Sequence, residues 1–388
     1  YDCDKYALNL KHCPTIAYSG EDDIQKQAAD VMEIALQEHQ IRMRHIIGAK
    51  MGHSIDKVSI DIIEAGMDSL AERGRVTGMT EMDFETHTLK YNRLQALSVD
   101  GLLEHWKPAH VAVRRMVGGR RPHNASFSVH TRNVSALTLD FPAGTFPAVA
   151  PSPLRVSFRP DQNAASQRSA KSEAVTGEGP FSDGSARVQA HLDQHGKWVA
   201  GPPEPGLRKR HNLQGPIDDA FMDSFVFVRP TGTAANKAAG EWAAAELERA
   251  IEHWRRHFRG DARVVNDTDV TDEIIQSANL ILWGDPSSNS VMSKVADQLP
   301  IQWTGTQVTV GGSNFDAAHH APILIYPTPL NADRYVVLNS SFTFREFAYL
   351  NNARQVPMLP DWAVVDLRTP AGNVWPGKIA AADFFDEQ

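Results

Sequence analysis

The fold of the N-terminal region is decided by the stretch TIAYSGEDD, residues 15–23. Its first four residues predict a short strand, and the polar residues that follow predict a turn. The stretch MRHIIGAKMGH, residues 43–53, repeats this order, with a strand followed by a turn that reaches His53. An amphipathic helix is expected between the two strands. The strand–helix–strand order therefore indicates a parallel pair joined by a crossover helix.

Two helices are predicted from apolar residues that recur close to the 3.6-residue period. The face of the first is made by Ile24, Ala28, Val31, Ala35 and Leu36. The second starts near Ser54 and uses Val58, Ile62, Ile63, Met67 and Leu70. A basic segment with a glycine, residues 73–75, predicts its end.

A carboxylate and a histidine follow the two predicted strands. Asp23 and His53 are 30 positions apart (53 − 23), and a parallel pair would deliver both side chains to the same edge of the sheet. Histidine suits a general base because its pKa lies near neutral, and an acid can hold it in the required tautomer. In α/β-hydrolases the triad follows the chain order Ser, Asp or Glu, His. The pair therefore predicts the last two members of such a triad. An Asp after a strand is also a common turn former or helix cap, and a loop histidine can simply be solvated.

With these residues, the segment resembles the end of the catalytic domain of prolyl-oligopeptidase-type serine peptidases. Asp23 matches the triad acid, three residues after a glycine that closes a strand, and Asp22 is the weaker match; His53 matches the triad histidine. The resemblance covers about the first 75 residues. It implies a Ser-Asp-His triad, a peptide or ester substrate, no cofactor, and a partial α/β-hydrolase sheet made of the last two βα units.

Three later segments resemble an extension that follows the hydrolase domain in large bacterial members of this group. They are GPIDDAF (215–221), LWGDPSSN (282–289) and YPTPLN (326–331). This resemblance supplies no role for the extension.

The nucleophile of the expected triad is absent. No Gly-x-Ser-x-Gly occurs, and the nearest segment, Gly179–Gly184, has the wrong spacing. We therefore expect a fragment of a serine hydrolase whose serine and oxyanion hole lie upstream, and which is inactive alone. The alternative is a non-catalytic binding or scaffolding module that carries a hydrolase remnant.

Three domains are expected: a partial hydrolase domain (1–76), a β-rich, sandwich-like domain (77–215) and a second open α/β domain (216–388). The middle domain is predicted from alternating segments at 84–89, 109–113 and 126–129. A long polar loop is expected at 159–184 and a linker at 201–205. In the last domain, strands are predicted at 225–228, 263–265, 280–283, 323–326 and 335–338, with helices at 236–258 and 274–278 and a turn at 327–331.

Composition excludes several classes of partner. The net charge of −8 argues against nucleic acid and anionic membranes, and no apolar run approaches the about 20 residues that span a bilayer. No signal-peptide pattern follows Tyr1, although we favour an exported location over a cytoplasmic one. Cys3 and Cys13 are read as two thiols, with a disulfide as the alternative. The oligomeric state is not predicted.

The remaining candidates have ordinary structural interpretations. We do not expect a metal at His319 and His320, because neighbouring side chains in a strand diverge. The pair His253 and His257 has the spacing of zinc ligands, but the surrounding arginines favour a solvated helix face. Residues 284–289 follow a strand and open a helix, so they are read as a structural turn, with ligand binding as the alternative. Residues 311–313 are read as a hairpin or loop glycine pair.

Overall fold

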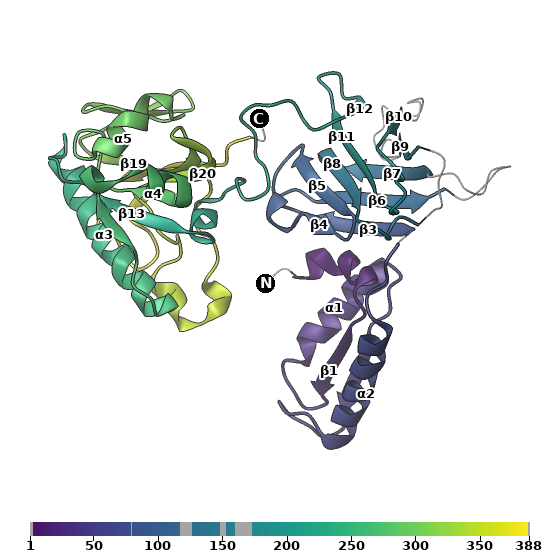
Figure 1. Ribbon diagram of the computed structural model, residues 1–388. Helices are drawn as coiled ribbons and strands as arrows, with labels where there is room; N and C mark the ends of the chain where they lie inside the picture. Colours follow the sequence, from purple (N-terminus) through teal and green to yellow (C-terminus); the bar gives the residue numbers. More distant parts are fainter. Residues whose placement is uncertain (1–2, 79, 117–125, 148–152, 160–172, 387–388) are drawn as a thin grey trace. The chain divides into compact units, whose positions relative to one another are not determined.

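The computed structural model describes residues 3–78, 80–116, 126–147, 153–159 and 173–386. The chain forms two compact units that divide between Arg208 and Lys209 (Figure 1). This division follows the expected linker at 201–205, whereas the sequence places a boundary at 215/216. The elements confirm a mixed class, α/β in part and β in part.

The first unit begins with two strand–helix repeats. The elements are η1 (Cys3–His12), β1 (Ile16–Gly20), α1 (Lys26–Glu38), β2 (Arg44–Gly48) and α2 (Lys57–Arg73). β1 and β2 pair in parallel, with Ile16 opposite Arg44 and Gly20 opposite Gly48, as the sequence predicts. α2 starts later than expected because the Asp56 carboxylate accepts a hydrogen bond from the Ser59 N–H and caps the helix there.

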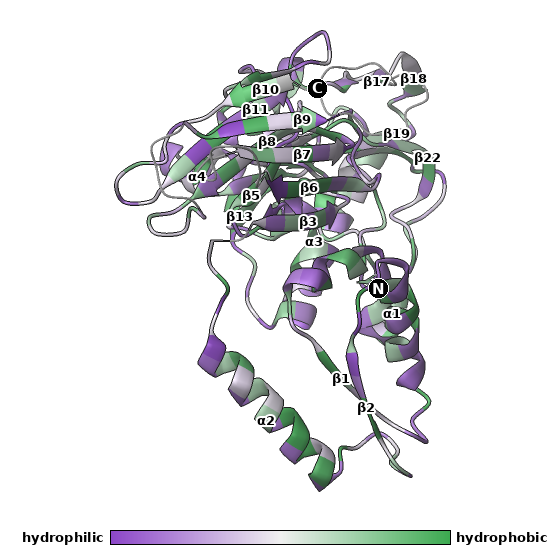
Figure 2. Cartoon of the chain, turned by 90° about the vertical axis from the view of Figure 1, so that its right-hand side faces the viewer, coloured by the Kyte–Doolittle hydropathy of each residue, from purple (hydrophilic) through white to green (hydrophobic). Residues whose placement is uncertain are grey.

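The apolar faces predicted for α1 and α2 are largely exposed among the described residues. Leu36 is buried, but Ile24 is 91% exposed, Val58 69% and Met67 61%. Ten of the 23 exposed large hydrophobic residues in the described part of the chain lie between Ile24 and Val76. Figure 2 shows apolar residues in green recurring along α2. A sheet of two strands offers too little surface to cover these faces.

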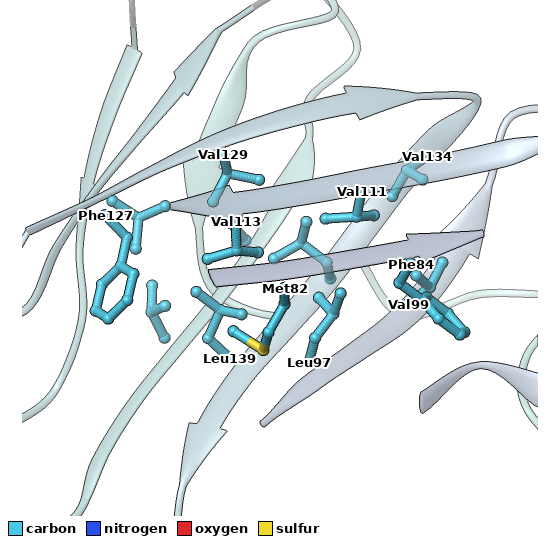
Figure 3. Packing of buried hydrophobic residues seen from close by; sticks show 14 of the residues in the cluster. Met82, Phe84, Leu97, Val99, Val111, Val113, Phe127, Val129, Val134 and Leu139 are labelled. Carbon is cyan, nitrogen blue, oxygen red and sulfur yellow. The ribbon is translucent and has the colours of Figure 1, made fainter. Parts of the chain in front are cut away.

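The rest of the first unit is a pair of five-stranded sheets that share one core (Figures 1 and 3). The first has the order β10-β9-β7-β6-β3 and the second β12-β11-β8-β5-β4. Met82, Val111 and Val129 of the first sheet share this core with Val99 and Leu139 of the second. The elements are β3 (Glu81–Thr86), η2 (Leu89–Tyr91), β4 (Arg93–Leu94), β5 (Leu97–Leu102), β6 (Ala109–Arg115), β7 (Ser126–Arg132), β8 (Val134–Phe141), β9 (Arg155–Arg159), β10 (Glu173–Thr176), β11 (Ala186–Leu192) and β12 (Trp198–Ala200).

The loop expected at 159–184 is only partly correct. Residues 160–172 lie outside the described residues. β10 occupies 173–176 and pairs with β9, so this part is strand instead of loop. The sequence signal was weak because four residues at a sheet edge carry little alternation.

η1 is fastened to β3, an edge strand of the first sheet. The Asn9 side chain bonds the backbone N–H and C=O of Glu85, both at 2.8 Å. The Asp83 carboxylate is held between Lys11 and Arg114. The chain therefore leaves the sandwich after η1 and returns to it at β3, with β1, α1, β2 and α2 in between.

The second unit is built on a seven-stranded sheet of order β14-β13-β15-β20-β19-β21-β22. The first four strands run parallel, and β19, β21 and β22 are antiparallel to their neighbours. All five predicted strands and both predicted helices are present. The elements are η3 (Ile217–Phe221), β13 (Phe225–Arg229), α3 (Lys237–Phe258), β14 (Val264–Asn266), η4 (Asp267–Asp269), α4 (Asp272–Ser277), β15 (Asn279–Leu282), α5 (Ser290–Val295), η5 (Ala296–Gln298), β16 (Gln302–Trp303), β17 (Gln307–Val310), β18 (Ser313–Asp316), β19 (His320–Thr328), β20 (Asn331–Leu338), η6 (Glu346–Leu350), η7 (Asn352–Arg354), β21 (Trp362–Asp366) and β22 (Lys378–Asp383).

Candidate active site

The parallel pairing of β1 and β2 brings Asp23 and His53 together. The Nδ1 atom of His53 lies 2.9 Å from the Oδ2 atom of Asp23. The other oxygen of Asp23 accepts a hydrogen bond from the Gln25 N–H at 2.9 Å. That backbone bond, and then the bond from His53, hold the pKa of Asp23 below its usual value. An ionised carboxylate only accepts, so Nδ1 of His53 carries the proton.

The two side chains differ in exposure. The Asp23 side chain is 12% exposed and the His53 side chain 76%. Among the described residues, none hydrogen-bonds the Nε2 atom of His53. With Nδ1 protonated, Nε2 is the nitrogen that can accept a proton. A carboxylate that fixes one imidazole nitrogen leaves the other available for proton transfer, so the geometry is compatible with general-base chemistry.

Close backbone contact fixes the two loops that carry this pair. The N–H of Glu21 donates to Gly48 C=O and that of Asp22 to Met51 C=O, both at 2.9 Å. A Cβ on Gly20 would lie 2.2 Å from the carbonyl oxygens of Met51 and Gly52. Only glycine allows this approach, whereas the sequence pattern predicts Gly20 only as the end of a strand. Asp22 is exposed.

No serine completes the site among the described residues. The segment nearest to a nucleophile motif, Gly179–Gly184, forms a loop between β10 and β11. Its Asp183 carboxylate accepts the Ser185 N–H, which is a local turn bond, and Ser182 is exposed. A nucleophile elbow needs a strand-to-helix turn, so this loop does not supply one.

A second hydrogen-bond chain lies on the side of the sheet that α1 covers. His45 Nδ1 is 3.2 Å from Glu33 Oε2, and His45 Nε2 is 3.0 Å from Ser19 Oγ. The sequence analysis missed it, although strand alternation could have placed Ser19 and His45 on one face. Asp30, Glu33 and His45 lie close enough to share a cation. Lys26 already pairs with Asp30, and both nitrogens of His45 are occupied, so the chain is a link between α1 and the sheet.

His253 and His257 do not lie on a solvated helix face, which corrects that prediction. His253 is 2% exposed and contacts Phe344 and Tyr349. Burial, and then the charge of Arg249, lower its pKa to about 3. The arginine Nη2 donates to His253 Nδ1 at 3.3 Å. The local helical pattern could not reveal this burial because the covering residues come from the segment after β20.

The other candidates form ordinary turns and ends. The Asp285 carboxylate accepts hydrogen bonds from the N–H groups of Ser287 and Ser288 within the turn, and from that of Ala235 just before α3. Asn289 caps α5, because its side chain accepts the N–H groups of Val291 and Met292. Gly311 and Gly312, both with positive φ, join β17 to β18 as a hairpin.

The remaining candidate histidines and the two cysteines have ordinary surroundings in the described part of the chain. The described candidate metal cluster contains neither His319 nor His320, and His320 Nδ1 is 2.9 Å from the Asp316 carbonyl oxygen. Cys3 and Cys13 are both free and exposed, not joined as a disulfide. In the described part of the chain, no helix has the length and apolar character needed to cross a bilayer.

Comparison with known proteins gives no relative. No family model, curated protein or solved structure matches the chain.

Proposed function

We propose that Asp23 and His53 are the acid and base of a serine hydrolase of prolyl-oligopeptidase type, acting on a peptide or ester bond. The observation that carries the proposal is the 2.9 Å contact between His53 Nδ1 and Asp23 Oδ2, on a histidine whose side chain is 76% exposed. The serine would be supplied by a segment outside these 388 residues, and the chain by itself would be inactive.

Each residue would have a distinct role in acyl transfer. Asp23 would keep His53 in the tautomer with Nδ1 protonated and would stabilise the imidazolium that forms. Nε2 of His53 would take the serine hydroxyl proton as the oxygen attacks the substrate carbonyl, and would return it to the leaving group. Water would then hydrolyse the acyl-serine by the same base.

The surroundings of Asp23 and His53 support the proposal that a further strand and helix pack beside β1. β1 pairs only with β2, which leaves its outer edge without a strand among the described residues. A groove of about 560 Å³ beside the start of β1 is lined in part by Ile16, Ile62 and Leu70. Parallel sheets are normally buried on both faces, so an additional strand and helix from a serine-bearing segment would cover these surfaces.

The test uses a longer form of the protein that contains a Gly-x-Ser-x-Gly elbow before Thr15. We expect His53→Ala and Asp23→Asn each to lower kcat for an activated ester by at least about 100-fold. Asp22→Asn is the matched control, because it makes the same change on an exposed neighbour, and it should stay within about twofold.

Retention of normal hydrolysis by His53→Ala would exclude the base role. An equal loss in Asp22→Asn and Asp23→Asn would exclude the assignment of the acid. If no longer form with a serine elbow exists, the binding or scaffolding module becomes the better interpretation.

A further inference from the structure

We infer that Glu21 and Tyr18 are positioning residues for His53, and that they hold the loop from Gly48 to Ser54 at its two ends. The catalytic meaning of this inference rests on the proposed function. The positioning of His53 beside Asp23 by these two residues does not depend on the proposed function.

The His53 side chain makes few contacts that could fix its position. It lies on the connection between β2 and α2, its side chain is 76% exposed, and Asp23 is its one side-chain partner among the described residues. The position of the ring therefore depends on the backbone of its loop.

Glu21 holds the entrance of this loop in two ways. Its Oε2 atom accepts a hydrogen bond from the Lys50 N–H at 2.8 Å, and its own N–H donates to Gly48 C=O at 2.9 Å. Lys50 has a φ of 57°, in the left-handed region, where the chain turns sharply. The Glu21 carboxylate is a charged acceptor for the N–H of this unfavourable residue, so it stabilises the turn.

Tyr18 holds the exit. Its hydroxyl donates to the C=O of Ser54 at 3.0 Å, one residue after His53, and lies 3.5 Å from Asp56 Oδ2. A Cβ on Gly48 would lie 2.1 Å from this hydroxyl, so the tyrosine ring lies directly against the loop start.

Both contacts come from the same strand end that carries Asp23. Tyr18 lies within β1, and Glu21 is one residue beyond it. One short element therefore provides the acid and the two contacts that locate the base. With these contacts in place, Asp23 and His53 keep their geometry although the His53 side chain is exposed.

The experiment follows the carboxyl ¹³C signal of Asp23 against pH by NMR in the 388-residue chain. His53 contributes to the lowered pKa of Asp23, so His53→Ala defines the upward shift caused by complete loss of this contact. We expect the double variant Tyr18→Phe/Glu21→Ala to reach more than half of that shift. Glu21→Gln keeps a neutral acceptor and should restore part of it.

Glu33→Gln is the matched control, because it alters a glutamate that bonds the other histidine of the same sheet, His45. It should leave the Asp23 titration unchanged. A double variant whose titration matches wild type overturns the inference, and so does a shift of equal size in Glu33→Gln. If Tyr18→Phe/Glu21→Ala does not fold, the single variants Tyr18→Phe and Glu21→Ala decide by the same comparison.

The catalytic part is read separately in the longer, serine-bearing form. There, Tyr18→Phe/Glu21→Ala should lower kcat about tenfold with KM unchanged, because the base is misplaced while substrate contacts remain. Absence of any hydrolysis in the wild-type form would refute the proposed function. The NMR result would still decide whether Tyr18 and Glu21 position His53.

Discussion

At the scale of single residues, Gly20 sets the distance between the two loops of the candidate site. It ends β1, and the carbonyl groups of Met51 and Gly52 occupy the space that a side chain would need. These carbonyls belong to the loop that carries His53. Any side chain at position 20 must therefore move that loop away from Asp23.

We predict that Gly20→Ala breaks the contact between Asp23 and His53 and destabilises the first unit by about 1–3 kcal/mol, the usual cost of forcing atoms into packed space. Gly52→Ala is the control, since a Cβ there meets no atom within 4 Å. It should change the free energy of unfolding by less than about 0.5 kcal/mol. Urea denaturation and the imidazole ¹⁵N signals of His53 measure both effects, and equal results for the two variants would contradict the argument.

At the scale of elements, β1 is the least supported strand of the candidate site. It has five residues and one neighbour, whereas β13 has the same length and lies between β14 and β15. The outward-pointing amides of β1 have no strand to receive them among the described residues. Strand edges of this kind open easily.

We therefore predict that, in the isolated 388-residue chain, amides of Ile16–Gly20 exchange with solvent much faster than those of Phe225–Arg229. Hydrogen exchange read by mass spectrometry or NMR provides the comparison within one sample. Full protection of β1 in a monomer would show that its edge is covered, which would remove this support for the proposed function.

Most of the helices and strands that could be predicted from the sequence have a strong local pattern. β13, β15, β19, β20 and α3 have strong apolar patterns, and the structure confirms all of them. The order strand, Asp23, helix, strand, His53 was enough to predict the contact between the two side chains. These features depend on local pattern and on the geometry of a parallel pair.

The features that could not be predicted are the exposure or burial of side chains, which depend on residues far away in the sequence. Periodicity predicted the apolar faces of α1 and α2 but not their exposure, because burial depends on a covering layer that a local pattern does not reveal. His253 was expected to be solvated, but Tyr349 and Phe344 cover it from nearly 100 positions away. The link through Ser19, His45 and Glu33 was not predicted, because strand alternation places Ser19 and His45 on one face but does not show which helix residue meets them.

At the scale of the whole molecule, the two units have separate cores. Each also contains a carboxyl group with a shifted pKa, and the two shifts have opposite directions. In the first unit, burial would raise the pKa of Asp83, but the hydrogen bonds from Lys11 and Arg114 outweigh it and lower the pKa. That contribution to stability is present above the ordinary Asp pKa and is lost as the pH falls. In the second unit, burial raises the pKa of Asp218 to about 6, despite the bonds from Thr343.

We predict that the second unit loses about 2–3 kcal/mol of stability as the pH rises from about 4 to about 6. The folded state favours the protonated form of Asp218, so stability is greatest below the unfolded pKa of 3.8 and declines through the folded value. Asp218→Asn should abolish this decline. Exchange of the β15 amides (Asn279–Leu282) across this pH range reports the second unit specifically.

Asp366→Asn is the control with the opposite sign. Hydrogen bonds from Arg368 hold the pKa of Asp366 well below its usual range, so its contribution is lost only in stronger acid. This variant should change the stability of the second unit only in stronger acid. The decline in stability between pH 4 and 6 should remain. A decline that persists in Asp218→Asn would assign it to another group.

The fastening of η1 to β3 has a mechanical consequence. A pull on the N-terminal end of the chain would first load the bonds from Asn9 and Lys11 to the sandwich, before it reached β1. The segment that carries Asp23 and His53 starts and ends at this clamp, so tension passes from η1 into β3 and bypasses it. The contact between Asp23 and His53 is thereby shielded from strain applied at the N-terminal end of the polypeptide.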